Sequence, residues 1–220
     1  MGALLEAGAF SLGIELSGTE IDRLLGYLDL LLAWNRKVNL TAITDPREAI
    51  EGHIVDALGA AGATRELDSV IDIGTGGGVP GIPLAILHPE QRWCLVETVH
   101  KKVGFLKAAI AQLGLSNARA FQVRATGNPD REGLSLCAGA ISRAFCAPDA
   151  WFDLARHYVR RPGQLIAMVS DKVCLDDIAR AFPHSLSEAS PGEWIDHWEY
   201  RLPRADIRRQ IFRLTIDAPN

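Results

Sequence analysis

The stretch SVIDIGTGGGVPGIPLA, residues 69–85, decides the fold of this chain because it joins a short apolar run to a dense run of glycines. Val70, Ile71 and Ile73 predict a buried β-strand. The turn that follows contains five glycines: Gly74, Gly76, Gly77, Gly78 and Gly81. A turn without side chains lets a ligand lie against the backbone N–H groups at the start of the next helix. The stretch therefore predicts a strand, a binding loop and a helix for a nucleotide-like ligand.

The glycine spacing alone does not identify the ligand. Gly76, Gly78 and Gly81 satisfy the G-x-G-x-x-G pattern of dinucleotide-binding loops. Pro80, however, has no N–H group to offer a pyrophosphate at the start of the helix. Asp72 favours a cationic ligand, and the spacing D-x-G-x-G-x-G that begins there resembles the first motif of Rossmann-like methyltransferases. Their ligand, S-adenosylmethionine, carries a sulfonium and an amino group and no phosphate. A plain tight turn would need only one or two glycines.

Length and composition indicate one compact domain with an appendage. The chain has 220 residues, of which 48% are hydrophobic, enough to bury a full core. We expect residues 1–64 to form an N-terminal helical extension on a core of residues 65–220. No apolar run approaches the roughly 20 residues of a membrane span, and no basic segment precedes an apolar one at the N-terminus. These features predict a soluble, cytoplasmic protein without a membrane partner. We also expect a monomer without an obligate protein partner.

Cysteine, histidine and charge content restrict the chemistry further. The four cysteines include no C-x-x-C pair and the six histidines lack metal-ligand spacing, so we expect reduced thiols and no metal. The net charge of −4 argues against a protein that holds naked nucleic acid by charge alone. Basic residues nevertheless cluster at Arg36–Lys37, Lys101–Lys102, Arg156–Arg161 and Arg201–Arg209. Most such clusters are solvated surface, and the sequence does not place them on one face.

Two helices are predicted before the glycine-rich loop. Ser17 and Glu20 form a capping-box pattern, and apolar residues follow at helical spacing for about four turns. Asp45 and Pro46 fit the N-cap and the first position of a second helix with an apolar face. We expect both helices to pack on one side of the sheet, and the residues before Ser17 to be irregular.

From residue 70 onward the predicted strands and helices alternate, which is typical of a parallel sheet. The predicted strands cover residues 70–73, 92–97, 118–123, 136–142 and 164–169, with an antiparallel pair over 194–201 and 209–215. The predicted helices cover residues 80–87, 101–113, 148–158 and 175–182. The fold class is therefore predicted to be α/β, with a seven-stranded, mostly parallel sheet and helices on both of its faces.

Four segments together resemble one family closely. They are WNRKVNLTAI (34–43), HIVD (53–56), DIGTGGGVPGIPL (72–84) and SRAF (142–145). The chain resembles the RsmG family, also called glucose-inhibited division protein B, of bacterial small-subunit rRNA guanine-N7 methyltransferases. The resemblance implies a Rossmann-like class I fold, S-adenosylmethionine as cofactor, and a guanine in the 530 loop of 16S rRNA as acceptor.

The resemblance also implies which residues bind the cofactor. Beyond Asp72, Gly76 and Gly78 of the loop, the family's positions fall on Gly74, Val79, Glu97, Thr98, Ala125, Thr126 and Arg143. The carboxyl ends of parallel strands are where ligands bind in such sheets, and these positions lie there. Glu97 ends an apolar strand about twenty residues after the loop, where a carboxylate can accept both ribose hydroxyls. Its alternative role is that of an ordinary surface acid.

The chain departs from the family at two places. The family usually has Arg-Ala-Glu after the third strand, where this chain has Arg124, Ala125 and Thr126. A contact on the adenine side is then weaker or made through the backbone. After the fifth strand the family usually has Met-Lys-Gly, whereas here Met168 is followed by Val-Ser-Asp and then Lys172. Lys172 is a candidate replacement for the missing lysine.

Guanine N7 has a free lone pair and no proton to lose, so its methylation needs no general base. The absence of a nucleophilic triad is therefore expected, and the candidates are residues that position the purine: Asn39, Thr41 and Arg143, with Phe145 beside them. Asn39 is equally well explained as a loop cap.

Two further residues near the candidates favour structural roles. Trp34 fits the core at a helix end better than a stacking platform. His53 fits a satisfied core histidine, with Asp56 as a possible partner one turn away.

The expected partner is 16S rRNA, presented within the 30S subunit or its precursor because the chain is acidic overall. The sequence leaves three other functions open. A protein of the same fold could methylate a small molecule or a protein, a nicotinamide-dependent oxidoreductase would use the G-x-G-x-x-G spacing, and a binding module would use the fold without turnover.

Overall fold

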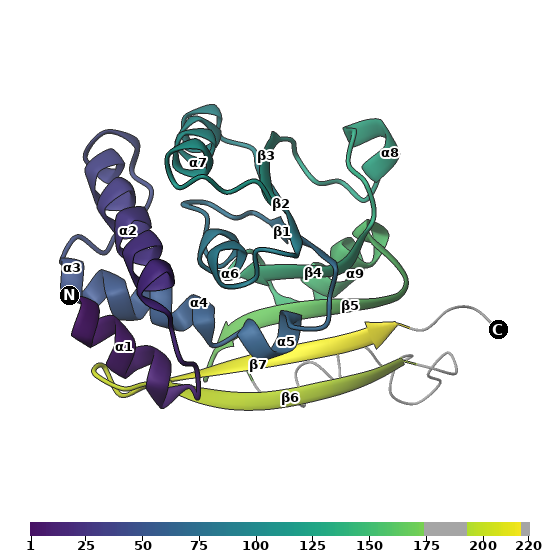
Figure 1. The fold of residues 1–220 in the computed structure, drawn as a ribbon. Coiled ribbons are helices and arrows are strands. Elements are labelled where there is room, and N and C mark those ends of the chain that lie inside the picture. Colours follow the sequence, from purple (N-terminus) through teal and green to yellow (C-terminus); the bar gives the residue numbers. More distant parts are fainter. Residues whose placement is uncertain (174–192, 217–220) are drawn as a thin grey trace.

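The computed structural model describes residues 1–173 and 193–216. Within these residues lies a seven-stranded sheet with the order β3-β2-β1-β4-β5-β7-β6 (Figure 1). The strands are β1 (Ser69–Ile73), β2 (Arg92–Glu97), β3 (Ala118–Gln122), β4 (Cys137–Arg143), β5 (Val159–Ser170), β6 (Glu193–Leu202) and β7 (Ile207–Ile216). Strands β1 to β5 are parallel, and β7 runs antiparallel to both of its neighbours. The predicted Rossmann-like class is confirmed, with the strand order reversing between β1 and β4.

The central strand β1 is buried along its whole length. Val70 joins the core that contains the N-terminal helices, whereas Ile71 and Ile73 belong to the core on the opposite face. Parallel strands covered on both faces are mostly apolar, which explains Val70, Ile71 and Ile73, while Asp72 is a buried polar exception.

Helices cover both faces of the sheet, as predicted. On one face, α6 (Gly81–Leu87) and α7 (His100–Gln112) contribute the buried side chains of Ile82, Phe105 and Leu106. On the other face, α9 (Pro148–Ala155) contributes Trp151 and Phe152 and continues into the 3-10 turn η2 (Arg156–Tyr158). A short helix, α8 (Pro129–Glu132), lies between β3 and β4 in sequence. The helix predicted over residues 175–182 lies outside the described residues.

The long helix α2 (Gly18–Val38) begins at the predicted capping box. The Ser17 hydroxyl accepts the Glu20 N–H at 3.3 Å, and the Glu20 carboxylate accepts the Ser17 N–H at 2.7 Å. The buried residues Leu24, Leu28 and Leu31 place α2 against α6 and α7, which is the predicted side of the sheet (Figure 1).

The second predicted helix is divided into three parts. Asp45 caps α3 (Pro46–Ala49) by accepting the N–H groups of Arg47 and Glu48, each at 2.9 Å. A π-helical turn, η1 (Ile50–Val55), separates α3 from α4 (Asp56–Leu58), and α5 (Ala61–Thr64) follows. A π turn shifts the register of side chains and is common at functional sites. In η1 and α4 three polar side chains are buried: Glu51, His53 and Asp56.

The expectation of an irregular N-terminus was wrong, because residues 2–11 form α1 (Gly2–Ser11). Its side chains Leu5 and Ala9 are fully buried, and the helix packs on η1. The helix has no side-chain cap, and its sequence is rich in glycine and alanine. The sequence therefore shows neither a capping residue nor a periodic apolar face that would predict a helix here. Short helices of this kind are stabilised by tertiary packing, which a local pattern does not report.

The antiparallel pair β6 and β7 extends the sheet beyond β5, as predicted. Ser170, at the end of β5, pairs with Arg209 near the start of β7, and Leu202 pairs with Ile207. The turn between β6 and β7 therefore lies at the edge where the parallel strands end, which is the ligand edge of such sheets. Within the described ranges no helix combines the length and the apolar character needed to cross a membrane.

Replacing Leu5 with alanine tests whether α1 belongs to the core. The side chain is fully buried, so Leu5→Ala should lower the free energy of unfolding by about 2–5 kcal/mol. Phe10 lies on the same helix and is 72% exposed, so Phe10→Ala should change that free energy by less than about 0.5 kcal/mol. Urea denaturation of both variants measures the difference, and equal small effects would show that α1 does not pack as described.

Candidate active site

The glycine-rich loop connects β1 to α6 at the carboxyl edge of the sheet. Gly74 has a φ of +75°, in the left-handed region that favours glycine. A Cβ atom at this position would also collide with the ring of Phe145. The fold therefore requires glycine at position 74, both because φ is positive there and because the Phe145 ring occupies the space of a side chain.

Asp72 lies beneath the loop and binds the loop itself. Its Oδ2 accepts the Thr75 hydroxyl at 2.6 Å and the Gly81 N–H at 2.9 Å. The side chain is fully buried, and its Oδ1 has no partner among the described residues. Burial raises the pKa of Asp72 to about 6, although the hydrogen bonds from Thr75 and Gly81 act in the opposite direction. The acid that sequence reasoning assigned to a cationic ligand is thus placed as the brace of the loop.

The N-terminal extension holds the loop from the other side. The Tyr27 hydroxyl of α2 donates a 2.6 Å hydrogen bond to the carbonyl oxygen of Gly77. A Cβ atom on Gly77 would lie 2.8 Å from Leu31 Cδ1 of the same helix. Helix α2 and the glycine-rich loop are therefore in direct contact, so the position of the loop depends on residues 18–38.

A pocket of about 450 Å³ opens beside the loop, and we call it the cofactor pocket. It is lined by Ile73, Gly74, Val96, Glu97, Thr98, Val123, Arg124, Ala125, Thr126, Ala144 and Phe145. Five of the residues expected to bind the cofactor are in this lining: Gly74, Glu97, Thr98, Ala125 and Thr126. The ends of β1, β2 and β3 thus bring together positions that are far apart in the sequence.

Five other residues expected to bind the cofactor do not line this pocket. They are Asp72, Gly76, Gly78, Val79 and Arg143. Val79 is buried in the core, and Asp72 lies beneath the loop. The N–H of Gly76 donates to Glu97 Oε2 at 3.1 Å, so this glycine acts through the carboxylate.

Glu97 ends β2 with its carboxylate fixed by backbone donors. Oε1 accepts the N–H groups of Thr98 at 2.7 Å and Val99 at 2.9 Å, while Oε2 accepts the N–H of Gly76. The side chain is only 7% exposed although it lines the cofactor pocket. Oε1 also accepts the Thr98 hydroxyl at 3.2 Å, whereas Oε2 accepts Gly76 alone and therefore retains a lone pair for a hydroxyl donor of a ligand.

At Thr126, where the chain departs from the family pattern, a different carboxylate is present. Glu132 Oε1 accepts both the N–H of Thr126 at 2.8 Å and its hydroxyl at 2.7 Å. The Tyr158 hydroxyl donates to Glu132 Oε2 at 2.6 Å and accepts the Gly127 N–H at 2.8 Å. The wall formed by Ala125 and Thr126 is thereby tied to α8 and η2, a connection that the sequence did not indicate.

A second pocket, of about 510 Å³, lies next to the first, and we call it the acceptor pocket because it is lined by Arg143 and Phe145, which are expected to position the base. It is lined by Asp56, Ser142, Arg143, Ala144, Phe145, Cys146, Ala147, Pro148, Trp151, Ala167, Met168, Val169, Ser170, Val173 and Arg209. Ala144 and Phe145 line both pockets. The ring of Phe145 is 42% exposed and meets Trp151 edge-on at 6.2 Å between ring centroids. Phe145 therefore stands between the two pockets, directly over Gly74.

Arg143 is held by the N-terminal extension. Its Nη1 donates to Asp56 Oδ2 and to the carbonyl oxygen of Gly52, both at 2.7 Å, and its Nη2 lies 3.3 Å from His53 Nδ1. An arginine at a strand end needs such partners, and it finds them in η1 and α4. The residue thus lines the acceptor pocket rather than the cofactor pocket.

Asp56, considered above as a possible partner of His53, binds groups from the sheet, while the His53 ring nitrogens face Thr41 and Arg143. Asp56 is 2% exposed and binds Arg143, the Tyr200 hydroxyl at 2.7 Å and Arg209 Nε at 3.4 Å. The sequence could not predict these partners, because they lie on β4, β6 and β7, far from Asp56 along the chain. His53 is buried as expected, and burial together with the Arg143 charge lowers its pKa to about 4. Because arginine only donates, His53 Nδ1 accepts and Nε2 donates to Thr41 Oγ1 at 2.7 Å.

Asn39, Thr41 and Trp34 line neither pocket. Asn39 is exposed and forms the left-handed C-cap of α2 with a φ of 54°, which is the capping role considered for it. Thr41 acts one step away, through the bond between its hydroxyl and His53. Trp34 packs edge-on against Phe105 at 5.8 Å, in the structural role expected of it. Lys172 is not in the lining of the acceptor pocket, although the neighbouring Val173 is.

The pKa of Asp72 predicts how stability depends on pH. The folded chain keeps the Asp72 proton to about pH 6 while the unfolded chain loses it near pH 4. The free energy of unfolding should therefore fall as pH rises from 4 to 6, by about 3 kcal/mol relative to Asp72→Asn. Urea denaturation across this range measures the difference, with the exposed Asp29→Asn as control. Parallel curves for the wild type and Asp72→Asn would contradict the assignment.

Comparisons with known proteins show which family the chain resembles. Residues 20–180 match the family model GidB, described as rRNA small subunit methyltransferase G. The ribosomal RNA small subunit methyltransferase G of Anaeromyxobacter sp. (strain Fw109-5) is 38% identical over 211 residues, 96% of this chain and 95% of that protein. The protein of the same name from Myxococcus xanthus (strain DK1622) is 38% identical over 208 residues, 94% of this chain and 93% of that protein.

A solved structure is similar in fold alone. The O-methyltransferase TomG from Streptomyces achromogenes, crystallised in complex with SAM, aligns with a TM-score of 0.56 at 16% identity, covering 87% of this chain and 90% of that one. The family model, in contrast, covers most of this chain, and the relatives extend over nearly all of it. The chain belongs to the GidB family of rRNA small subunit methyltransferase G proteins.

Proposed function

We propose that this protein transfers a methyl group from S-adenosylmethionine to N7 of a guanine in the 530 loop of 16S rRNA. The observation that carries the proposal is the junction of two pockets, which share Ala144 and Phe145 beside Gly74. A donor in one pocket and a base in the other would meet where the two pockets adjoin, beside Ala144 and Phe145. The family supplies the acceptor class, and the resemblance of the sequence motifs supplies the guanine and its atom.

The residues of the cofactor pocket fit S-adenosylmethionine. Glu97 presents a carboxylate for the ribose hydroxyls, and the apolar side chains of Val96, Val123 and Ala125 form walls suited to adenine. Gly74 leaves room for the Phe145 ring above the loop, where any side chain would collide with it. The bound cofactor supplies an electrophilic methyl group on a sulfonium, and Thr98 and Thr126 complete the lining.

The protein's part in the reaction is to position the base. Guanine N7 attacks with its own lone pair, so no residue has to remove a proton. Phe145 and Trp151 offer aromatic surface for an extruded purine. Arg143 is oriented by Asp56 and can donate to the guanine O6 while N7 stays free. Holding N7 in line with the transferred group accounts for most of the rate gain that such a site can provide.

The dinucleotide alternative has little support in this loop. Pro80, the N-cap of α6, has no N–H group, and the N–H of Gly81 is donated to Asp72. A pyrophosphate needs free N–H groups at a helix N-terminus. Helix α6 offers neither of these two donors, so we do not favour an oxidoreductase.

We further propose that the acceptor is presented on the 30S subunit or its precursor, to a cytoplasmic and monomeric enzyme. The net charge of −4 makes strong binding of naked RNA over the whole surface unfavourable. Residues 1–64 would act as an extension that supports the site, since Tyr27 contacts the glycine-rich loop and Asp56 holds Arg143.

Methyl transfer to 30S subunits lacking N7 methylation tests the proposal. Labelled S-adenosylmethionine should transfer its label to RNA, and mass spectrometry should identify 7-methylguanosine at one position in the 530 loop. Label in another nucleoside, in protein or in a small molecule would refute the proposed acceptor while preserving the fold. Activity on naked 16S rRNA that exceeds activity on 30S subunits would refute the proposed form of the substrate.

Glu97→Gln tests the cofactor pocket separately from the acceptor. The substitution removes the negative charge and replaces one carboxylate oxygen with an NH2 group. It should weaken S-adenosylhomocysteine binding about ten- to a hundredfold, or roughly 1.5–3 kcal/mol. Isothermal titration calorimetry measures this affinity, and thermal unfolding without ligand checks that the loop stays folded. Glu90→Gln is the matched control, since Glu90 is exposed and lies in the turn before β2, at the opposite edge of the sheet from the glycine-rich loop. Unchanged affinity in Glu97→Gln would place the ribose elsewhere.

A further inference from the structure

The turn between β6 and β7 carries an unusual density of arginine. Residues 201–209 read RLPRADIRR and contain four arginines and one acid, in a chain whose net charge is −4. We call these residues the arginine turn. Arg201, Arg204 and Arg208 are exposed, and Arg209 is half-buried in the lining of the acceptor pocket. Figure 1 shows the turn below α1, at the end of the sheet where the N-terminal helices lie.

The arginine turn is anchored from below by a buried acid. The Glu51 carboxylate of η1 is 7% exposed and accepts the backbone N–H groups of Arg204 and Ala205, the latter at 3.0 Å. Asp56, in the following helix, pairs with Arg209. The backbone of the turn is thus bound to the same segment that orients Arg143, while the side chains of Arg201, Arg204 and Arg208 are exposed.

Two of the arginines have no acidic partner within the described residues. Arg201 pairs with Asp206 at 2.6 Å and Arg209 with Asp56, but Arg204 and Arg208 make no ion pair there. The basic cluster at residues 156–161 differs both in its acidic partners and in its position on the sheet. Arg160 pairs with Asp68 at 2.9 Å, and the cluster lies near the start of β5, at the edge away from the pockets.

We propose that the arginine turn is a docking surface for RNA phosphate groups that flank the target nucleotide. This inference rests on the proposed function, because it places phosphates next to a base that occupies the acceptor pocket. Arginine forks match phosphate geometry, and unpaired, exposed guanidinium groups are available to bind it. A rigid backbone lowers the entropy lost when the side chains engage. Local basic charge beside the pocket also lets an acidic protein meet RNA at one place only.

The salt dependence of binding tests the proposal. The variant Arg204→Ala/Arg208→Ala should weaken binding to 30S subunits on the order of tenfold at 0.1 M KCl, because two phosphate contacts are lost. The slope of log K against log salt should become shallower by about 1.4–1.8. In methylation assays, KM for the subunit should rise on the order of tenfold with kcat unchanged, and S-adenosylhomocysteine affinity should stay at the wild-type value.

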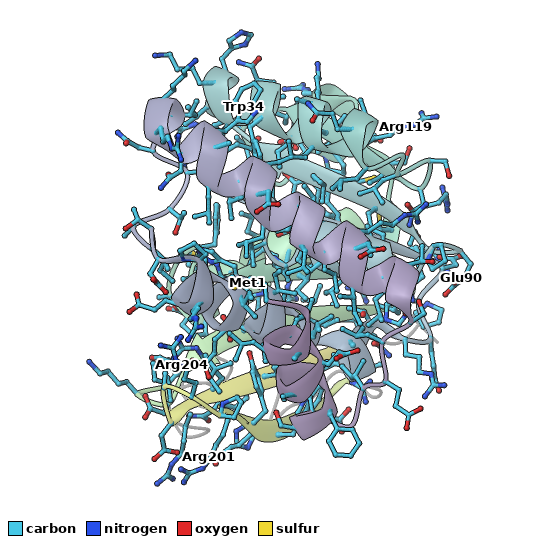
Figure 2. All side chains as sticks on the ribbon, turned by 60° about the vertical axis from the view of Figure 1, so that its left-hand side comes forward. Met1, Trp34, Glu90, Arg119, Arg201 and Arg204 are labelled. Carbon is cyan, nitrogen blue, oxygen red and sulfur yellow. The ribbon has the colours of Figure 1, made fainter. Side chains whose placement is uncertain are left out.

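The matched control is Lys107→Ala/Arg119→Ala, on exposed residues of α7 and β3 at the opposite edge of the sheet. Figure 2 shows Arg119 far from Arg201 and Arg204. This control should keep the wild-type slope and KM. Equal slopes for the two double variants would overturn the proposal, as would weaker binding without a change of slope, which would indicate a contact with ribosomal protein.

The test separates this inference from the proposed function. If the wild type methylates the guanine while Arg204→Ala/Arg208→Ala keeps the wild-type slope and KM, the docking surface is refuted and the function stands. If no RNA is labelled but the variant shows the shallower slope, the docking surface stands and the proposed reaction is refuted.

Discussion

The site depends on the hydrogen bonds and ion pairs made by one buried carboxylate, that of Asp56. It lies at the start of α4 and accepts Arg143 from β4, Tyr200 from β6 and Arg209 from β7. A buried charge without partners is costly, so the four elements that supply these groups have to meet at one point. Removing Arg143 or Arg209 would take away one of the two cationic partners of Asp56. The N-terminal extension and the C-terminal strands are thus joined to the sheet at the same place where the acceptor pocket is formed.

Asp72 performs the equivalent task for the cofactor pocket. Its Oδ2 binds Thr75 and Gly81 at the two ends of the glycine-rich loop, and Tyr27 binds Gly77 between them. The loop is therefore held in shape before any ligand arrives. Preorganisation of this kind lowers the entropy cost of binding and keeps reacting groups at a fixed separation.

The chemistry expected of the site explains which residues it lacks. A reaction that needs no proton transfer makes few demands on pKa values, and among the described residues the strongly shifted groups serve structure. Asp72 braces a loop, and His53 stays neutral to connect Thr41 with Arg143. What the site does provide is shape: two adjoining pockets, an aromatic residue between them, and arginines fixed on one side. Positioning is the contribution that such an arrangement can make.

The sequence by itself determined the class of the fold, because strand period, glycine spacing and the caps at Ser17 and Asp45 are local properties of the backbone. It also determined the residues at the strand ends that line the cofactor pocket, Glu97 among them, since the carboxyl ends of parallel strands share one edge. Only the tertiary structure decided that Arg143 faces the acceptor pocket, that Asp56 binds arginines and not His53, and that α1 is a helix at all. These outcomes depend on pairs such as Asp56 with Tyr200, which lie 144 residues apart. Burial forces such polar groups to find partners across the whole fold, and no local pattern records which partner is nearest.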